Sequence, residues 1–245
     1  MRISFSKFAT LLTALASTIS AQTNAPKACP FSPGATYDVK AFARRLGVAD
    51  VNGDGKLDII VPNDNSSLRS SILLGNGDGT FQPATIPDVP GSATAVAIAD
   101  LNGDGKLDLA ISHYAEFSTA LLGNADGTFQ PYISFHAPGV GSDISIADFD
   151  GDGHPDLAIA EIGLSGVRIA LGRGDGTFHT SQVLNGGKQV WAVTTGDFNR
   201  DGHPDVAATS LFKQDVSVFP EQGRRYVWAS PAPTGRPVAT ASHRY

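Results

Sequence analysis

The 245-residue chain has little of several features that stabilise or direct other proteins. It has one cysteine, Cys29, so no disulfide can form within the chain. Only 17% of its residues are charged, and no basic stripe is present, so we expect no nucleic-acid partner. Beyond the first residues, no segment has the apolar period of an amphipathic helix. A disulfide-stapled domain and a helical bundle are therefore not expected.

The longest apolar run lies at the N-terminus. A positively charged start leads into the uncharged segment 8–19, which is too short to span a bilayer and has the length of an export-signal core. We expect residues 1–21 to be a signal peptide, residues 22–36 to be a linker, and no stable membrane span after signal removal. The predicted location is secreted or cell surface. The alternative is that the segment remains as an uncleaved anchor.

Four acidic loops of nine residues are the most prominent feature that is present. Their first aspartates are 50, 48 and 49 residues apart. Each loop has Asp or Asn at positions one, three, five and nine, glycine at position six, and a position-seven residue that offers its carbonyl. Such oxygen ligands suit Ca²⁺, which takes six to eight of them, and we predict up to four Ca²⁺ sites. The candidate ligands are Asp50, Asn52, Asp54, Lys56 and Asp58; Asp100, Asn102, Asp104, Lys106 and Asp108; Asp148, Asp150, Asp152, His154 and Asp156; and Asp197, Asn199, Asp201, His203 and Asp205.

The charge balance supports a bound cation. The loops hold thirteen of the 24 acidic residues, in a chain of net charge −6. Carboxylates held close together repel one another unless a counter-ion is present. Position twelve is apolar or alanine rather than the glutamate of an EF-hand. The alternative is that these are Asp/Asn-Gly turns that bind nothing, and the fourth loop is the weakest candidate because Arg200 replaces a glycine.

Each repeat is predicted to form four short strands, rich in Val, Ile and Leu and bounded by Gly, Asn, Asp and Pro. The strand before each acidic loop alternates large and small side chains. In the second repeat Val96 and Ile98 alternate with Ala97 and Ala99. Alternate residues face opposite sides of a strand, so this pattern predicts a strand buried on both faces between two packed sheets. A repeat of 48–50 residues predicts a propeller or a solenoid.

A second motif recurs in register with the acidic loops. It occupies residues 74–81, 122–129 and 171–178 and reads LGNGDGTF, LGNADGTF and LGRGDGTF. It favours hairpin turns with positive φ, followed by a phenylalanine anchor in the core. Together the two motifs resemble FG-GAP/VCBS-type repeats, which occur in the N-terminal β-propeller of integrin α-chains and in exported bacterial proteins. The resemblance implies an all-β fold over residues 37–226, a partial or truncated β-propeller of about four four-stranded blades. It also implies Ca²⁺ held between the first two strands of each blade.

The end of the repeat region departs from this pattern. The fourth repeat lacks the second motif, so we expect an incomplete last blade, followed over residues 227–245 by an irregular tail that is a candidate for disorder. We expect a truncated or frame-shifted form of a longer repeat protein; the alternative is a genuine tail. A partial propeller leaves exposed blade edges, which are candidates for self-association.

No nucleophile motif is present, and we predict that the chain is not an enzyme. His113, His136 and His179 are expected to be solvated or structural. Trp191 and Tyr132 are expected to pack in the core, and the alternative is that they line a ligand surface. The predicted function is an exported calcium-binding module that binds an extracellular protein or glycan, as in adhesion. The alternative is a noncatalytic part or remnant of an exported polysaccharide-active enzyme.

Overall fold

The structure is a computed structural model, and it describes residues 34–39, 44–64, 70–163, 166–212 and 215–221 and the backbone of 226–228. The chain divides into two units, Met1–Thr36 and Tyr37–Tyr245. The expected signal peptide, most of the expected linker, Cys29 and the tail beyond Trp228 lie outside the described residues. In the described part no helix is long and apolar enough to cross a membrane.

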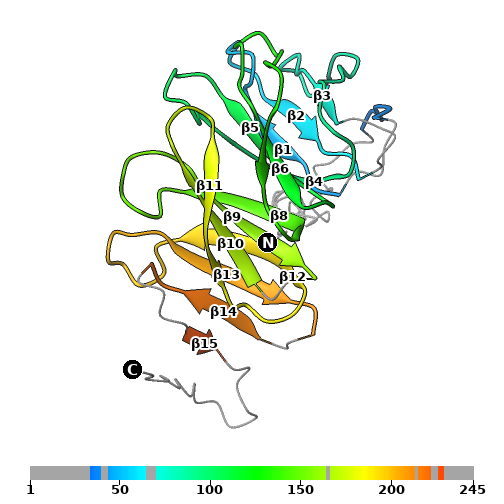
Figure 1. Cartoon of the computed structure of the whole chain (residues 1–245). Helices are drawn as coiled ribbons and strands as arrows, with labels where there is room; N and C mark the ends of the chain where they lie inside the picture. The colour runs from blue at the N-terminus through cyan, green and yellow to red at the C-terminus, as the bar shows by residue number, and fades with distance from the viewer. Residues whose placement is uncertain are drawn as a thin grey trace, which may run out of the picture. The chain divides into compact units, whose positions relative to one another are not determined.

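Within the described residues, fifteen strands form four antiparallel sheets, and each sheet is built from strands that are consecutive in the chain (Figure 1). The first sheet contains β1 (Gly47–Ala49), β2 (Asp58–Val61) and β3 (Ser71–Leu73). The second contains β4 (Ala93–Ala99), β5 (Asp108–His113), β6 (Phe117–Leu121) and β7 (Ile133–His136). The third contains β8 (Val140–Ala147), β9 (Asp156–Ile162), β10 (Gly166–Gly172) and β11 (Phe178–Leu184). The fourth contains β12 (Val190–Gly196), β13 (Asp205–Ser210), β14 (Val216–Phe219) and β15 (Tyr226–Trp228). The predicted all-β architecture of successive antiparallel sheets is confirmed, with four strands in three of the sheets and three in the first.

The first and fourth sheets differ from the expected blade in detail. In the first sheet Thr85 forms an isolated antiparallel bridge with Ile72 of β3, at the place of a fourth strand. In the fourth sheet β15 pairs with β14, so this sheet has four strands although the second motif is missing. The expectation of an incomplete last blade is therefore wrong on strand number. The reason is that backbone groups at the free edge of β14 can pair with any extended segment, whatever its motif.

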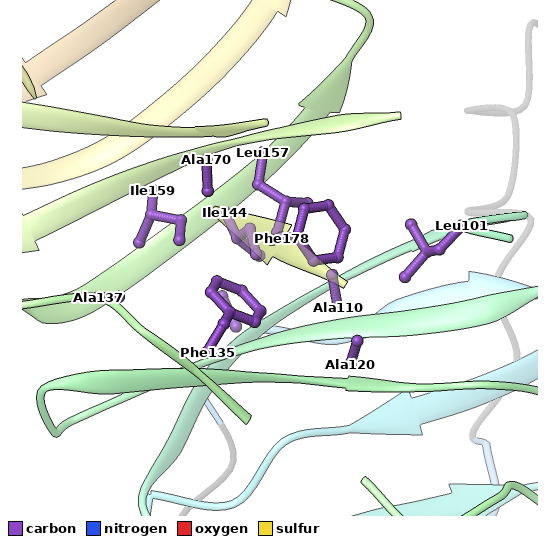
Figure 2. Packing of buried hydrophobic residues seen from close by; sticks show 11 residues of the cluster. Leu101, Ala110, Ala120, Phe135, Ala137, Ile144, Leu157, Ile159, Ala170 and Phe178 are labelled. Carbon is purple, nitrogen blue, oxygen red and sulfur yellow. The ribbon is translucent and has the colours of Figure 1, made fainter. Parts of the chain in front are cut away.

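Three hydrophobic clusters lie between successive sheets. The cluster between the second and third sheets contains Leu101, Ile144 and Leu157, and Figure 2 shows them around two phenylalanine rings. The rings of Phe135 and Phe178 lie 5.1 Å apart, so the anchor predicted at the end of the third repeat's second motif is in the core. Each sheet is thus held by its neighbours rather than by a single central core.

The inner strands β1, β4, β8 and β12 follow the predicted size alternation. Val96 and Ile98 of β4 pack in the cluster shared with the first sheet, and Ala97 and Ala99 pack in the cluster shared with the third. A Cβ atom at Gly47 of β1 would lie 2.8 Å from Cδ1 of Ile98. Large side chains therefore face the preceding sheet, and small residues let the following sheet come close.

The prediction of burial on both faces holds for β4 and is wrong for β1. Leu46 and Val48, which occupy the large positions of the first repeat, are 61% and 51% exposed. Among the described residues no sheet precedes β1, so these two side chains have nothing to pack against.

Polar contacts also join neighbouring sheets. The Thr94 hydroxyl donates to the Gly141 carbonyl at 2.9 Å, and the Ser142 hydroxyl donates to the Val190 carbonyl at the same distance. Thr94 and Ser142 stand at the same position of successive repeats, six residues before the first loop aspartate. The same hydrogen bond therefore connects the second sheet to the third and the third to the fourth.

Two arginines before β1 reach sheets that are not its neighbours. The Arg45 guanidinium lies 3.1 Å from the carboxylate of Asp143 in β8. Arg44 lies over the Trp191 ring of β12, 5.7 Å from the ring centroid. Burial raises the pKa of Asp143, and Arg45 and the Val193 amide counter this shift. The arginines thus link the first repeat to the third and fourth.

Candidate metal centre

Each acidic loop connects the first two strands of its sheet. The first loop aspartate directly follows the inner strand, and the ninth is the first residue of the next strand. The loop is therefore the connection of a β-hairpin. The two strands of the hairpin pair right up to the loop, as Ala49 of β1 does with Asp58 of β2. The first and ninth carboxylates are brought together by this pairing, although they are eight residues apart.

The first loop aspartate organises the loop backbone. In the second loop Asp100 accepts hydrogen bonds from the amides of Gly103 at 2.7 Å, Asp104 at 3.1 Å and Gly105 at 2.8 Å. The side-chain oxygen of Asn102 accepts a further bond from the Asp104 amide at 3.0 Å. These bonds curl the chain around the carboxylate and turn positions one and three toward the same side.

The curl needs left-handed backbone at positions four and six. Gly103 and Gly105 have φ of 74° and 80°, values that glycine adopts without strain. In the fourth loop Arg200 adopts φ of 64° at position four and still donates its amide to Asp197 at 2.5 Å. The fourth loop therefore keeps the shared geometry in spite of its arginine, at the cost of backbone strain.

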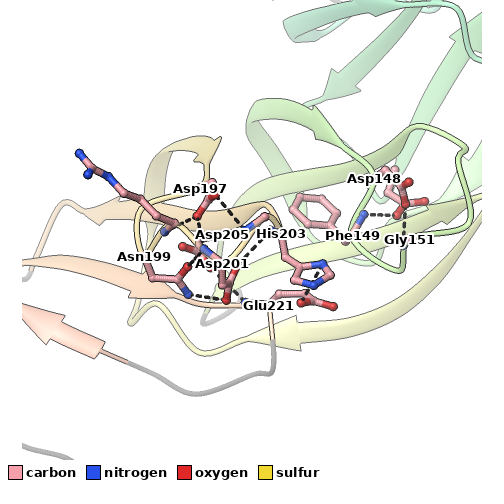
Figure 3. A network of polar contacts seen from close by, with 12 residues as sticks. Asp148, Phe149, Gly151, Asp197, Asn199, Asp201, His203, Asp205 and Glu221 are labelled. Atoms are coloured by element: carbon pink, nitrogen blue, oxygen red, sulfur yellow. Dashed lines mark hydrogen bonds and ion pairs between the residues drawn. The ribbon is translucent and has the colours of Figure 1, made fainter.

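Carboxylates converge most closely in the third loop. Oxygens of Asp148, Asp150 and Asp156 all lie within 4.8 Å of one another, and this group could hold a metal ion. The other loops have Asn at position three, which offers a neutral amide oxygen instead. Figure 3 shows the first carboxylates of the third and fourth loops, with backbone amides directed at them. The remaining predicted ligands stay a prediction.

The ninth aspartates are the buried members of each loop. Asp108 accepts amide hydrogen bonds from Leu101 of its own loop at 2.8 Å and from Gly123 of the second motif at 2.7 Å. The same pair of bonds recurs in every sheet. The equivalent acceptors and their two donors are Asp58 with Val51 and Gly75, Asp156 with Phe149 and Gly172, and Asp205 with Phe198 and Glu221.

Sequence reasoning missed this second role of the ninth aspartate. Its signal is the glycine that follows leucine in the second motif. A Cβ at Gly123 would clash with the Leu107 carbonyl oxygen, so glycine lets this amide approach Asp108 to 2.7 Å. Gly75 and Gly172 are placed in the same way. The two repeated motifs therefore meet at one carboxylate.

The electrostatics of the loop differ between its inner and outer carboxylates. Burial raises the pKa of Asp108 and of Asp156, and neighbouring loop carboxylates raise it further. At position five the backbone amide of Lys106 holds the pKa of Asp104 below its usual range, and the lysine side chain adds to this effect. The inner carboxylates are thus the ones for which a nearby cation would make most difference.

The residue at position seven does more than the sequence predicted. Lys56 and Lys106 were expected to contribute only their carbonyls. Their ammonium groups also lie 3.1 and 3.2 Å from the carboxylates of Asp54 and Asp104, at position five. In the fourth loop His203 instead lies 3.4 Å from Glu221 (Figure 3). An ion in the first two loops would therefore share its position-five ligand with a lysine.

Outside the loops, one histidine lies as expected and two aromatic side chains do not. His113 is fully buried, bonded to the Thr119 hydroxyl at 2.9 Å and stacked on Phe117, so its role is structural and not solvated. Trp191 and Tyr132 are 40% and 42% exposed, so the expectation of core packing is wrong for both. Trp191 instead lies beneath the Arg44 guanidinium, 5.7 Å from the ring centroid.

The second motif forms the predicted hairpin turns. In the second sheet Asp126 accepts from the Thr128 amide at 2.8 Å, and Ala125 and Gly127 have φ of 63° and 83°. The turn is therefore closed by its own aspartate and threonine. Gly123, at the start of the motif, remains free to donate its amide to Asp108.

Comparison with known proteins agrees with this architecture. Models of the FG-GAP-like repeat match residues 50–111, 114–159 and 148–208, and the FG-GAP repeat model matches residues 190–228. No curated protein matches the chain.

Several solved structures are similar at low identity. They include BBS1N in complex with ARL6DN, with 11% identity and a TM-score of 0.50 over 74% of this chain and 51% of that one. The V. cholerae biofilm matrix protein Bap1 has 20% identity and a TM-score of 0.40 over 74% and 38%. The exotype rhamnogalacturonan lyase YesX has 14% identity and a TM-score of 0.44 over 85% and 57%. The chain spans about half the length of these structures. The repeat models cover more than half of the chain, and the chain belongs to the FG-GAP repeat family.

Proposed function

We propose that this chain is an exported, noncatalytic binding module whose four acidic loops each bind Ca²⁺. The observation that carries the proposal is the convergence of Asp148, Asp150 and Asp156 within 4.8 Å, in a loop whose backbone geometry recurs in the other three repeats. The proposed ligands are the predicted residues at positions one, three, five, seven and nine of each loop.

The electrostatic argument favours a divalent cation. Asp108 and Asp156 are buried beside other carboxylates, and both conditions raise the pKa and disfavour the charged form. A cation among the loop oxygens would compensate for both. Ca²⁺ suits the loop better than Mg²⁺, because Mg²⁺ demands near-ideal octahedral geometry and gives up its waters reluctantly.

The proposed role of the ion is stability. An ion that binds only the folded loop stabilises the folded state by mass action. We expect affinities in the weak extracellular range, roughly 10⁻⁴–10⁻³ M. At a hundredfold excess over its dissociation constant, each ion would add about 2.7 kcal/mol.

The proposed ligand of the module is an extracellular protein or glycan. FG-GAP family membership supports an extracellular binding role, and the apolar N-terminal segment supports export. Tyr114, Tyr132 and Trp191 are between 40% and 52% exposed and offer aromatic surface of the kind that such ligands contact. Recognition would then depend on the blades, and the ions would keep the blades folded.

Isothermal titration calorimetry of the chelated protein tests calcium binding. We expect saturable Ca²⁺ binding at up to four sites, little response to Mg²⁺, and a rise in melting temperature with Ca²⁺. Asp104→Ala should remove one site and leave the others. Asp126→Ala is the matched control, since this exposed aspartate of the same sheet only closes the outer turn. Absence of both binding heat and a melting shift would refute the calcium proposal.

A glycan array and a screen for hydrolase and lyase activity test the module's role. Binding without turnover supports a noncatalytic module. Turnover of a polysaccharide by the purified chain would refute it and favour a part of a polysaccharide-active enzyme.

A further inference from the structure

In the part of the chain that the structure describes, no sheet covers the outer face of the first sheet or that of the fourth. We name the first face as Leu46, Val48 and Ile59 of the first sheet, and the last face as Thr194, Gly196 and Ala207 of the fourth. Val48 pairs with Ile59, and Thr194 pairs with Ala207, so each pair projects from one side of its sheet. The first face carries large side chains and the last face carries small ones.

Within the chain, a face with large side chains packs on a face with small ones at three junctions between sheets. Val96 and Ile98 of β4 pack against Gly47 and Ala49 of β1. At the next two junctions Ile144 and Ile146 of β8 join Ala97 and Ala99 of β4, and Thr195 of β12 meets Ser145 of β8 at 3.0 Å. Every junction therefore places the large face of one sheet on the small face of the sheet before it.

Exposure shows that the end faces lack this partner. Leu109 and Leu157 are 0% exposed, whereas Ile59, which occupies the same position of the first sheet, is only half-buried. Ala110 and Ala158 are likewise fully buried, but the equivalent Ala207 is not. The difference lies in the neighbour and not in the residue type.

The last face also has room for a bulky side chain. A cavity of about 250 Å³ opens beside it, lined by Thr194, Ala207 and Val216 of the fourth sheet and, on its inner side, by the Arg45–Asp143 ion pair. Val216 is 42% exposed beside this cavity. Large aliphatic side chains such as those of Leu46 and Val48 would fill such a hollow, as Ile98 fills the space beside Gly47.

We propose that the first face of one copy of this chain packs on the last face of a second copy. The chain carries a large face and a small face of the kinds that its three internal junctions join, so a second copy offers the matching combination. The contact is head-to-tail, and in the proposed dimer each copy contributes both of its end faces, so that the two contacts are equivalent. This inference does not depend on calcium binding.

Analytical ultracentrifugation of the chain and its variants, all in one calcium-containing buffer, tests the proposal. We expect wild-type dimers at high concentration. Val48→Asp places a charge on the first face and should weaken dimerisation at least about tenfold. Val183→Asp is the matched control, because Val183 is 46% exposed on β11 of the third sheet, which has neighbours on both sides. It should leave dimerisation unchanged.

A mixing experiment identifies the two faces as partners. Thr194→Lys alone should also weaken dimerisation. An equimolar mixture of Val48→Asp and Thr194→Lys should restore dimers, because one junction then pairs Asp with Lys and the other is wild type on both sides. Unchanged circular dichroism of each variant establishes that it folds. A wild-type monomer at all concentrations, equal effects of Val48→Asp and Val183→Asp, or failure of the mixture to dimerise would each overturn the proposal.

Discussion

The middle sheets and the end sheets have the same sequence code but differ in how much of it is buried. Leu157 in the third sheet is 0% exposed, whereas Ile59, at the same position of the first sheet, keeps contact with solvent. In a repeat protein each unit contacts mainly its neighbours, so its stability is the sum of its own terms and those of its interfaces. The comparison shows that apolar side chains contribute according to the sheets beside them.

The largest expected effect tests this difference directly. Leu157→Ala should lower the free energy of unfolding by about 3 kcal/mol, because it leaves a cavity between two packed sheets. Ile59→Ala should lower it by only about 1 kcal/mol, because part of that side chain is already in solvent. Urea unfolding followed by circular dichroism measures both. Equal losses would show that the first sheet is covered as fully as the third.

The second effect concerns the buried histidine of a middle sheet. Burial lowers the pKa of His113 from 6.5 to about 4, so the folded state disfavours the proton that the unfolded state accepts. Stability is therefore fully present above about pH 6.5 and is lost as pH falls toward 4, by up to about 3 kcal/mol. Urea midpoints between pH 7 and 4 measure the slope.

The control for the histidine prediction is a pair of variants. His113→Gln should remove this part of the pH dependence. His179→Gln should leave the dependence unchanged, since His179 is exposed on β11. A wild-type slope in His113→Gln would show that another group is responsible.

The third effect compares the loop of a middle sheet with that of an end sheet. Arg200→Gly should stabilise the protein by about 1 kcal/mol, because it removes left-handed strain at φ of 64°. Gly151→Arg makes the reciprocal change in the third loop, where nothing lies within 4 Å of a new Cβ, and should lose a similar amount. Melting temperatures at high salt, which screens the charge change, measure both. A destabilised Arg200→Gly would mean that the arginine makes a compensating contact.

The smallest expected effect compares the Ca²⁺ affinity of the acidic loop in an end sheet with that of the loop in a middle sheet. Lys56→Ala and Lys106→Ala each free a position-five carboxylate and should raise Ca²⁺ affinity by about threefold, in keeping with a weak exposed ion pair. The gains should be equal, because the two ion pairs are alike at 3.1 and 3.2 Å. Calorimetric titration measures them, with His154→Ala as the control. Unequal gains would show that the loop of an end sheet differs from that of a middle sheet.

Features that depend on nearby residues could be predicted from the sequence. The hairpin position of each loop, the turns of the second motif and the size alternation of the inner strands all follow from local spacing. The exposure of Leu46 and Val48 could not be predicted in this way, because it depends on which sheets are present beside them. The pairing of β15 was also missed, since backbone hydrogen bonds to a free edge leave no residue pattern.

The candidate site shows the same division. Asp58 was identified as a loop oxygen donor, but its bond to Gly75 joins residues from two motifs seventeen positions apart. Only the fold brings them together. The ion pairs of Lys56 and Lys106 were missed because a side chain at position seven can turn toward or away from the loop, and spacing alone does not decide between these orientations.

In the first three blades the ninth aspartate links the acidic loop directly to the turn of the second motif. A protease site or a fluorophore placed at the outer turn would therefore report on the occupancy of a loop that it does not touch. In the fourth blade the hydrogen bond to the ninth aspartate is longer. Where Glu221 takes the place of glycine, its amide stands 3.2 Å from Asp205, compared with 2.7 Å for Gly123 and Asp108. Signals from the last loop should accordingly be the weakest of the four at such a probe.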